Sequence, residues 1–376
     1  MAFEALTQYL EHLPAEGVPG CDMEIRVGYE PVYRHRVGLG RPNRPMTGDE
    51  TYWFYSATKL YTMTAVMQQI ERGKLRLDMP VAEVLPEFGE LTVRESDGTV
   101  RPARTVLTLR HLMSMQGGLD YDRDTPEIHE VQRLYGAKAT TRQLVAAFAR
   151  HPLQFDPGTH FLYSLCHDVA AAMVEVVSGM TYGEYLKRNI LEPLGSTGVT
   201  TRPGEQEIAA LAQRYIWDEN GHLSKTPDLT SNEYMLSDVY ESGGACLMGT
   251  LDGYMPLPEA LANGGVGRTG KRILTQESIH TMRTDQMHGA SVQDFGKLER
   301  PGYSYALGVR VLVDDGPSRS PIGEFGWDGA AGAWVMIDTE RHVSCVYLQH
   351  VLNCGRAYAE FHPTIRDLVY EGLEAL

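Results

Sequence analysis

The chain has 376 residues, of which 43% are hydrophobic and 22% are charged, and its formal net charge is -15 at pH 7. A chain of this length and composition can bury a large core, as a soluble globular protein of one composite unit or two domains does. The excess of negative charge argues against a nucleic-acid backbone as partner, and no apolar run reaches the length of a membrane helix.

The first elements expected along the chain are a helix and a hairpin. Residues 3–13 place apolar side chains on one helical side, and alternating patterns at 23–27 and 32–37 predict two antiparallel strands. The first residues contain no basic segment, apolar segment or cleavage site of a leader peptide. This predicts a cytoplasmic protein, or a periplasmic or secreted one if a leader has been removed.

The next element sets a serine beside a lysine. An aromatic run at 52–55 ends at Ser56, where a helical pattern begins. Residues three apart share a helix face, so Lys59 directs its amine back toward the Ser56 hydroxyl. The amine accepts the serine proton only if burial or a neighbouring cation keeps it partly neutral. A capping serine with a solvated lysine is the alternative, but this Ser-x-x-Lys match is unique in the chain and opens a strongly amphipathic pattern.

The middle of the chain is expected to be mainly helical. Residues 75–105 are rich in Pro, Gly and charge and predict a long loop, and a short helix at 108–119 is ended by paired glycines. Residues 218–221 predict a turn between short strands. Further helical patterns occur at 140–150, 166–178 and 181–192.

Strands return in the last part of the chain. Helices are expected at 251–263, 274–282 and about 357–374, and β-rich runs at 303–311, 333–337 and 343–348. Strands at both ends with helices between them predict an α+β fold, in which an antiparallel sheet flanked by helices carries an inserted all-α domain. We assign 1–80 and 230–376 to a discontinuous α/β domain and 81–229 to a mainly α-helical domain.

Neither a disulfide framework nor a metal site is indicated. The five cysteines form no Cys-x-x-Cys pair, so reduced and mostly buried thiols are expected. The thirteen histidines are scattered and no His-Glu-x-x-His motif occurs. We therefore expect no metal ion and no cofactor.

Several motifs resemble those of one enzyme superfamily. Residues 54–59, Phe-Tyr-Ser-Ala-Thr-Lys, followed by 71–81, are similar to the first signature of the serine beta-lactamases and penicillin-binding proteins. Within that superfamily the chain looks most like the class C-like carboxylesterases, the family VIII esterases. The stretch at 108–119 and the Ser-Gly-Gly loop at 242–244 match further landmarks in the same order. The resemblance covers most of the chain and implies the superfamily's fold, with the site in a cleft between sheet and helical lobe.

The resemblance implies a tyrosine as the third catalytic group. Tyr163 stands just before a helix, where the family places its Tyr-x-Asn tyrosine. A phenol held near a lysine ammonium can have its pKa lowered and carry a proton. The third position of this motif is Leu165 and not asparagine, a departure that disfavours beta-lactam hydrolysis.

The resemblance also implies a strand edge that binds the substrate carbonyl. Residues 327–329, Trp-Asp-Gly, stand where the family carries Lys-Thr-Gly, His-x-Gly or, in esterases, Trp-x-Gly. Gly329 permits close approach, so the N–H groups of Ala330 and Ser56 can converge as an oxyanion hole. Trp327 in place of lysine removes the cation expected to hold a substrate carboxylate, and Asp328 adds an opposing charge. The alternative is a Gly-rich turn with a packed tryptophan.

Other candidate nucleophiles and bases are weaker. Residues 302–306 approach Gly-x-Ser-x-Gly, but Ser304 falls within an expected strand, where a nucleophile elbow would not lie. Histidines near helices are more often hydrogen-bonded packing residues, so we assign no role to His111, His160 or His167.

These observations predict a serine hydrolase that forms an acyl-enzyme on carboxylic esters. Ser56 is the expected nucleophile, and Lys59 and Tyr163 share the roles of base and proton carrier, with the immediate base left open. The alternatives are a D-amino-acid peptidase or weak beta-lactamase of the same fold, an acyltransferase to an acceptor other than water, and a catalytically silent scaffold. The expected partner is a small-molecule ester or amide, with no nucleic acid and no membrane; the sequence indicates neither the natural substrate nor the oligomeric state.

Overall fold

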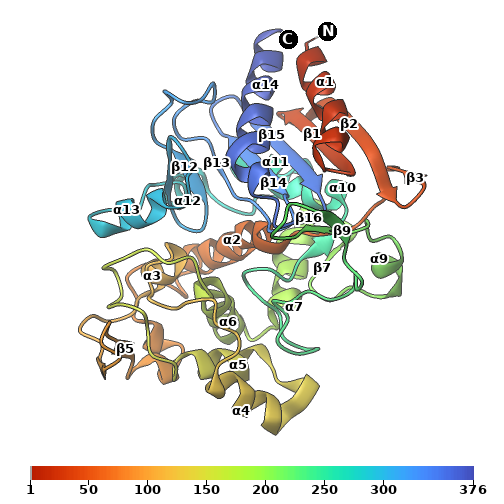
Figure 1. Ribbon diagram of the computed structural model, residues 1–376. Coiled ribbons are helices and arrows are strands. Elements are labelled where there is room, and N and C mark those ends of the chain that lie inside the picture. The colour runs from red at the N-terminus through yellow and green to blue at the C-terminus, as the bar shows by residue number, and fades with distance from the viewer. Residues whose placement is uncertain (1) are drawn as a thin grey trace.

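Strands from both ends of the chain build the main sheet in the computed structural model, which describes residues 2–376 (Figure 1). All neighbouring pairs are antiparallel, in the order β11-β12-β13-β14-β15-β1-β2-β3. The strands are β1 (Gly20–Val27), β2 (Glu30–Arg41), β3 (Arg44–Pro45), β11 (Tyr303–Tyr305), β12 (Arg310–Leu312), β13 (Phe325–Gly326), β14 (Trp334–Asp338) and β15 (Val343–Gln349).

One face of this sheet is covered by the helices at the two ends of the chain. Side chains alternate along a strand, so Met23 and Ile25 of β1 point to the same face. They pack there in an apolar cluster with residues of α1 (Glu4–His12) and α14 (His362–Glu374), which lie side by side in Figure 1. This packing joins the first and last helices to the same core.

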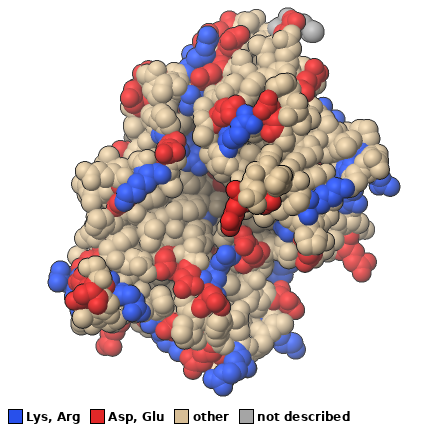
Figure 2. Space-filling model, viewed as in Figure 1, with Lys and Arg blue, Asp and Glu red and all other residues tan. Residues whose placement is uncertain are grey.

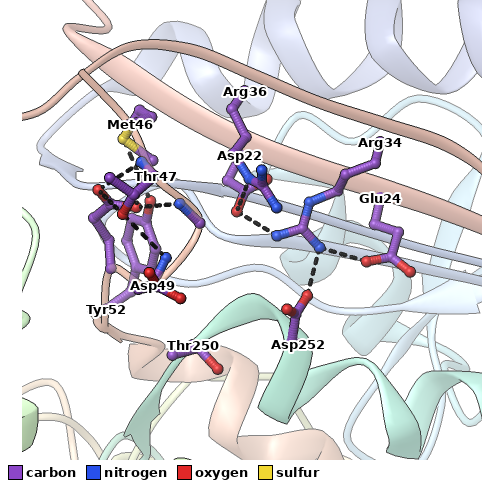
Figure 3. Close-up of polar contacts among 12 residues, drawn as sticks. Asp22, Glu24, Arg34, Arg36, Met46, Thr47, Asp49, Tyr52, Thr250 and Asp252 are labelled. Atoms are coloured by element: carbon purple, nitrogen blue, oxygen red, sulfur yellow. Dashed lines mark hydrogen bonds and ion pairs between the residues drawn. The ribbon is translucent and has the colours of Figure 1, made fainter.

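The alternate side chains of β1 form a charged cluster on the opposite face (Figure 3). Arg34 of β2 lies at its centre, paired with Asp22 at 2.6 Å, with Asp252 at 2.6 Å and with Glu24. Arg36 reaches Asp22 at 3.7 Å. Because Asp252 belongs to α10 (Leu251–Tyr254), the cluster connects the sheet to the helix that precedes α11 (Pro256–Ala262).

The helix that follows Ser56 is buried on all sides. This is α2 (Thr58–Glu71), in which residues 58–69 are all buried. It contacts α6 (Cys166–Ser178) on one side and α12 (Gln276–Met282) on another, between the sheet and the helical part of the molecule (Figure 1). The expectation of a strongly amphipathic helix is therefore wrong, because both its apolar and its polar residues are buried.

The rest of the chain contributes short helices and small sheets. The other helices are α3 (Leu109–Met113), α4 (Pro126–Tyr135), α5 (Thr141–Phe148), α7 (Tyr182–Leu186), α8 (Glu192–Leu194), α9 (Glu205–Ala209) and α13 (Ala290–Gly296). The small sheets pair β4 (Tyr52–Trp53) with β10 (Met248–Gly249) and β7 (Val199–Thr200), β16 (Val351–Leu352) with β8 (Tyr215–Trp217) and β9 (Leu223–Lys225), and β5 (Thr92–Arg94) with β6 (Val100–Pro102).

Several elements, α9 and α13 among them, differ from the sequence-based expectation. The expected loop at 75–105 contains the β5–β6 hairpin. The expected strand at 303–311 is the hairpin β11–β12, because Gly308 with φ +81° turns the chain back. Helix α4 was not expected; Thr125 caps it through the Ile128 amide, and Pro126 follows at its first position.

The predicted fold class is confirmed, and so is the turn at 218–221 between β8 and β9. The division into an α/β domain (1–80 and 230–376) and a helical domain (81–229) stays a prediction.

All five cysteines are free and buried. Within residues 2–376, no helix is both long enough and apolar enough to cross a membrane.

Candidate active site

Ser56 lies in a 3₁₀ turn, Tyr55–Ala57, that leads directly into α2. Tyr55 has φ +47°, a backbone conformation that side-chain-bearing residues seldom adopt and that is found at functional sites. Its hydroxyl accepts a hydrogen bond of 2.7 Å from the buried Arg214, which supports the turn. The N-cap positions of the turn and of α2 are Phe54 and Ala57, so Ser56 is not the capping residue.

The Lys59 amine is buried and contacts the serine. It donates hydrogen bonds to the Tyr121 hydroxyl at 3.0 Å and the Gly244 carbonyl at 2.9 Å, and lies 3.2 Å from Ser56 Oγ. Burial lowers the pKa of Lys59 to about 7, although the carboxylate of Asp168 acts in the opposite direction. A substantial fraction of the amine is therefore unprotonated at neutral pH and can accept the serine proton.

Tyr163 lines the same cavity as Ser56. Its hydroxyl accepts a hydrogen bond of 2.8 Å from Trp327 Nε1 and also hydrogen-bonds with Ser56. Burial raises the pKa of Tyr163 well above its usual range, and the bonds to Ser56 and Trp327 offset this only in part. The expectation that a lysine ammonium lowers this pKa is wrong, because the Lys59 amine lies over the ring, 4.7 Å from its centroid, and burial dominates.

The turn after β13 is held against the nucleophile. A Cβ on Gly329 would lie 2.2 Å from the Phe54 carbonyl oxygen, so only glycine permits this approach. Tyr358 donates a hydrogen bond of 2.8 Å to the Gly329 carbonyl, and His362 Nε2 lies 3.2 Å from the Gly332 carbonyl. Both anchors come from the C-terminal segment of the chain.

Ser56 lines a cavity of about 250 Å³, and Figure 2 shows the viewed face hollowed between the upper and lower parts of the molecule. Five of the eleven lining residues are aromatic, and one carries a guanidinium. The cavity is lined by Ser56, Tyr121, Tyr163, Tyr234, Leu298, Arg300, Trp327, Asp328, Gly329, Ala330 and Tyr358. The structure thus brings together Ser56, Tyr163, Trp327, Gly329 and Ala330, with Lys59 buried beneath the serine.

Leu165 does not belong to this cavity. It is buried, precedes α6, and faces a different, smaller cavity with Leu119 and Phe148. The chain turns after Tyr163 to begin α6, which points the Leu165 side chain into the helical core. Its prediction as a substrate-binding residue is therefore corrected.

Asp328 presents no unpaired negative charge. Its buried carboxylate pairs with Arg310 at 2.9 Å and with Arg300. Burial alone would raise the pKa of Asp328, but the two arginines outweigh it and hold the pKa below its usual value. The expectation that Asp328 opposes a substrate carboxylate is therefore wrong.

Sequence reasoning missed Tyr121, Tyr234, Leu298, Arg300 and Tyr358 as lining residues. Tyr121 alone had a signal nearby, because it follows the paired glycines that end the 108–119 stretch. The others lie in segments without a motif, and only the fold brings them to the serine.

The other candidates have structural contacts. His111 completes the capping box of α3, and His167 Nε2 lies 3.2 Å from the Met113 carbonyl. His160 pairs with Asp294 at 2.7 Å on the surface. Ser304 donates a hydrogen bond of 2.5 Å to Asp285 from strand β11. None of these four residues lines the Ser56 cavity.

Comparisons with known proteins point to one family. Residues 6–358 match the family model described as beta-lactamase. The chain is similar to esterase EstB of Burkholderia gladioli, with 27% identity over 368 residues that cover 91% of this chain and 88% of that protein. It is 30% identical to acyltransferase calJ of Penicillium decumbens over 80% of this chain and 75% of that protein. Among solved structures, it is similar to EstCE1, described as a hydrolase with promiscuous acyltransferase activity, with a TM-score of 0.78, 25% identity and 98% of each chain covered.

Proposed function

The chain belongs to the beta-lactamase family, and we propose that it is a serine hydrolase that cleaves carboxylic esters through an acyl-enzyme on Ser56. The observation that carries this proposal is the buried Lys59 amine, whose pKa is about 7, at 3.2 Å from the Ser56 hydroxyl. The similarity to an esterase and to a hydrolase supports an ester as the substrate class.

The acylation step uses Lys59 as the base. The neutral amine takes the Ser56 proton while Oγ attacks the ester carbonyl, and the N–H groups of Ser56 and Ala330 bind the oxyanion. Tyr163 gives its proton to the departing alkoxide and regains one from the Lys59 ammonium. The raised pKa of Tyr163 supports a neutral phenol in this role and disfavours a phenolate base. Water then enters in place of the alcohol, and the same groups act in reverse to release the acid.

Transfer of the acyl group to an alcohol is a second candidate. It uses the same acyl-enzyme with an alcohol in place of water, and the similarity to acyltransferase calJ and to EstCE1 favours it. Product analysis by mass spectrometry, with a short alcohol added to the hydrolysis reaction, distinguishes the two. A new ester whose yield rises with alcohol concentration indicates transfer, and free acid alone indicates hydrolysis.

A panel of p-nitrophenyl esters beside a chromogenic cephalosporin tests the proposed function. We expect ester hydrolysis by the wild type, little or no cephalosporin hydrolysis, and a loss of kcat of about a thousandfold or more in Ser56→Ala. Ser304→Ala is the matched control, because this serine lies in strand β11 and hydrogen-bonds with Asp285. Faster turnover of the cephalosporin than of every ester would replace the esterase assignment with a beta-lactamase.

A further inference from the structure

Arg300 is the only arginine or lysine among the described residues that line the Ser56 cavity. Its guanidinium lies over the Trp327 ring at 5.2 Å from the centroid and over the Tyr358 ring at 5.3 Å. These two rings fix the orientation of a side chain that is 15% exposed. The cavity is therefore lined by one cationic side chain and five aromatic ones.

The guanidinium has hydrogen-bonding capacity left over. Arg300 forms an ion pair with Asp328, but within residues 2–376 its buried Nε has no hydrogen-bond partner. A guanidinium carries five N–H donors. Asp328 also pairs with Arg310 at 2.9 Å, so its charge is shared between two arginines. Arg300 can thus bind a further acceptor without giving up its structural partner.

We propose that Arg300 recognises the carboxylate of hemiester substrates, meaning diacids with one end free and the other esterified. This proposal rests on the proposed esterase function. A carboxylate matches the planar fork of a guanidinium, and a partly desolvated pair of this kind is strong. Arg300 supplies its cation over the Trp327 indole ring, where both residues line the Ser56 cavity.

The geometry orients such a substrate along one wall. Trp327 donates its indole N–H to Tyr163, which hydrogen-bonds with Ser56, and it carries Arg300 over its ring. With the ester carbonyl at Ser56, the free carboxylate at the other end of the substrate would therefore extend along the Trp327 indole toward Arg300. The methylene groups between the two ends would lie against aromatic side chains, where burial of apolar surface is favourable.

The test compares two esters of matched length. Monomethyl glutarate and methyl pentanoate differ at the far end of the acyl chain, where one has a carboxylate and the other a methyl group. We measure kcat/KM for both by proton release, in the wild type, Arg300→Met and Arg300→Lys. We expect the ratio of the glutarate value to the pentanoate value to fall by about tenfold to a hundredfold in Arg300→Met and to be partly restored in Arg300→Lys.

Arg123→Met is the matched control. Arg123 stacks on Tyr234 at 4.4 Å but does not line the cavity, so its removal changes the nearby charge without removing the proposed contact. We expect its ratio to equal that of the wild type. An equal fall in Arg123→Met, or no fall in Arg300→Met, would overturn the assignment of Arg300 as the carboxylate contact.

Binding of the two esters to Ser56→Ala tests the Arg300 proposal independently of the proposed esterase function. Calorimetry with both esters measures recognition without turnover. If Ser56→Ala binds monomethyl glutarate more tightly than methyl pentanoate, and Ser56→Ala/Arg300→Met does not, the Arg300 proposal is supported. This conclusion would hold even if the wild type hydrolysed neither ester, because the lack of hydrolysis would contradict only the esterase function. Equal binding of both esters by Ser56→Ala would contradict the Arg300 proposal alone.

Discussion

Burial, and not a neighbouring cation, lowers the pKa of Lys59 and allows its amine to act as a base. Its amine is fully buried. Asp168, the acid with the largest electrostatic effect on this amine, is also buried, and desolvation raises the pKa of Asp168. Tyr240 donates a hydrogen bond of 2.6 Å to that acid, and the Gly244 carbonyl and the Tyr121 hydroxyl accept from the amine. The amine is thus oriented by neutral groups, which leaves its lone pair available once the proton is lost.

The pH profile follows from this pKa. Because the neutral amine is the reactive form, we expect kcat/KM for a neutral ester to rise with pH through about 7 and to level off above it. The profile is measured with p-nitrophenyl ester hydrolysis, corrected for the uncatalysed rate. A rate that is flat or falls across this range would contradict Lys59 as the base.

The pH dependence of the free energy of unfolding should also reflect the lowered pKa of Lys59. The folded-state pKa of about 7 lies below the ordinary lysine pKa of 10.5, so the unfolded chain binds more protons between these values. The Lys59 contribution to the free energy of unfolding is therefore least favourable below pH 7 and improves as pH rises toward 10.5. In denaturant titrations, Lys59→Met should lack this rise. An identical pH dependence in both proteins would contradict the lowered pKa.

At the scale of elements, α2 illustrates what the sequence could and could not predict. The spacing of the two residues was sufficient to predict that Ser56 lies beside Lys59, because residues three positions apart in a helix share a face. Burial of the helix could not be inferred, because Thr62 and Gln68 look like solvent-facing residues. In the fold Thr62 bonds the Gly243 carbonyl, and Gln68 donates to carbonyls of Asn189 and Ile273, so each polar group is satisfied inside the core.

The charged cluster on the sheet is a second element-scale feature (Figure 3). Arg34 is the shared partner of Asp22, Glu24 and Asp252, and the first two of these acids are buried. Removing one partner of a buried ion pair leaves a charge without compensation. Arg34 therefore provides an ionic link between α10 and the sheet.

Arg34→Met should lower the free energy of unfolding by about 3 kcal/mol, because the buried Asp22 then keeps only Arg36 at 3.7 Å, whereas Glu24 keeps its ion pair with Arg26 at 2.5 Å. The measurement is urea denaturation at neutral pH. Arg36→Met is the control: its side chain is 38% exposed and lies 3.7 Å from Asp22, so its loss should cost roughly 1 kcal/mol or less. Equal losses in the two variants would show that Arg34 is not the centre of the cluster.

At the scale of the whole molecule, the candidate site depends on both ends of the chain. The sheet joins β1 to β15, and the C-terminal segment supplies Tyr358 and His362 to the turn that carries Ala330. Motifs located the turn, but the residues that hold it carry no motif, and only the long-range pairing of the sheet brings them there. The same holds for Arg300, which precedes the edge strand β11 and lines the same cavity as Ser56.

Tyr358→Phe should lower kcat by about threefold to tenfold, since the Gly329 carbonyl loses its hydrogen bond and the turn that carries the Ala330 amide is held less rigidly. The control is Tyr370→Phe, which removes a hydrogen bond of 3.0 Å to Asp338 from α14, the helix that follows the segment of Tyr358. Both variants should lose similar stability, measured by thermal unfolding. A loss of kcat in Tyr370→Phe as large as in Tyr358→Phe would indicate a general effect of weakening the helix.

The most direct measurement of the central claim is mass spectrometry of the intact protein after reaction with a fluorophosphonate, followed by peptide mapping. A nucleophilic Ser56 activated by Lys59 predicts a single adduct, located on Ser56, and no adduct in Ser56→Ala with unchanged circular dichroism. An adduct on another residue, or equal labelling of Ser56→Ala, would contradict Ser56 as the nucleophile.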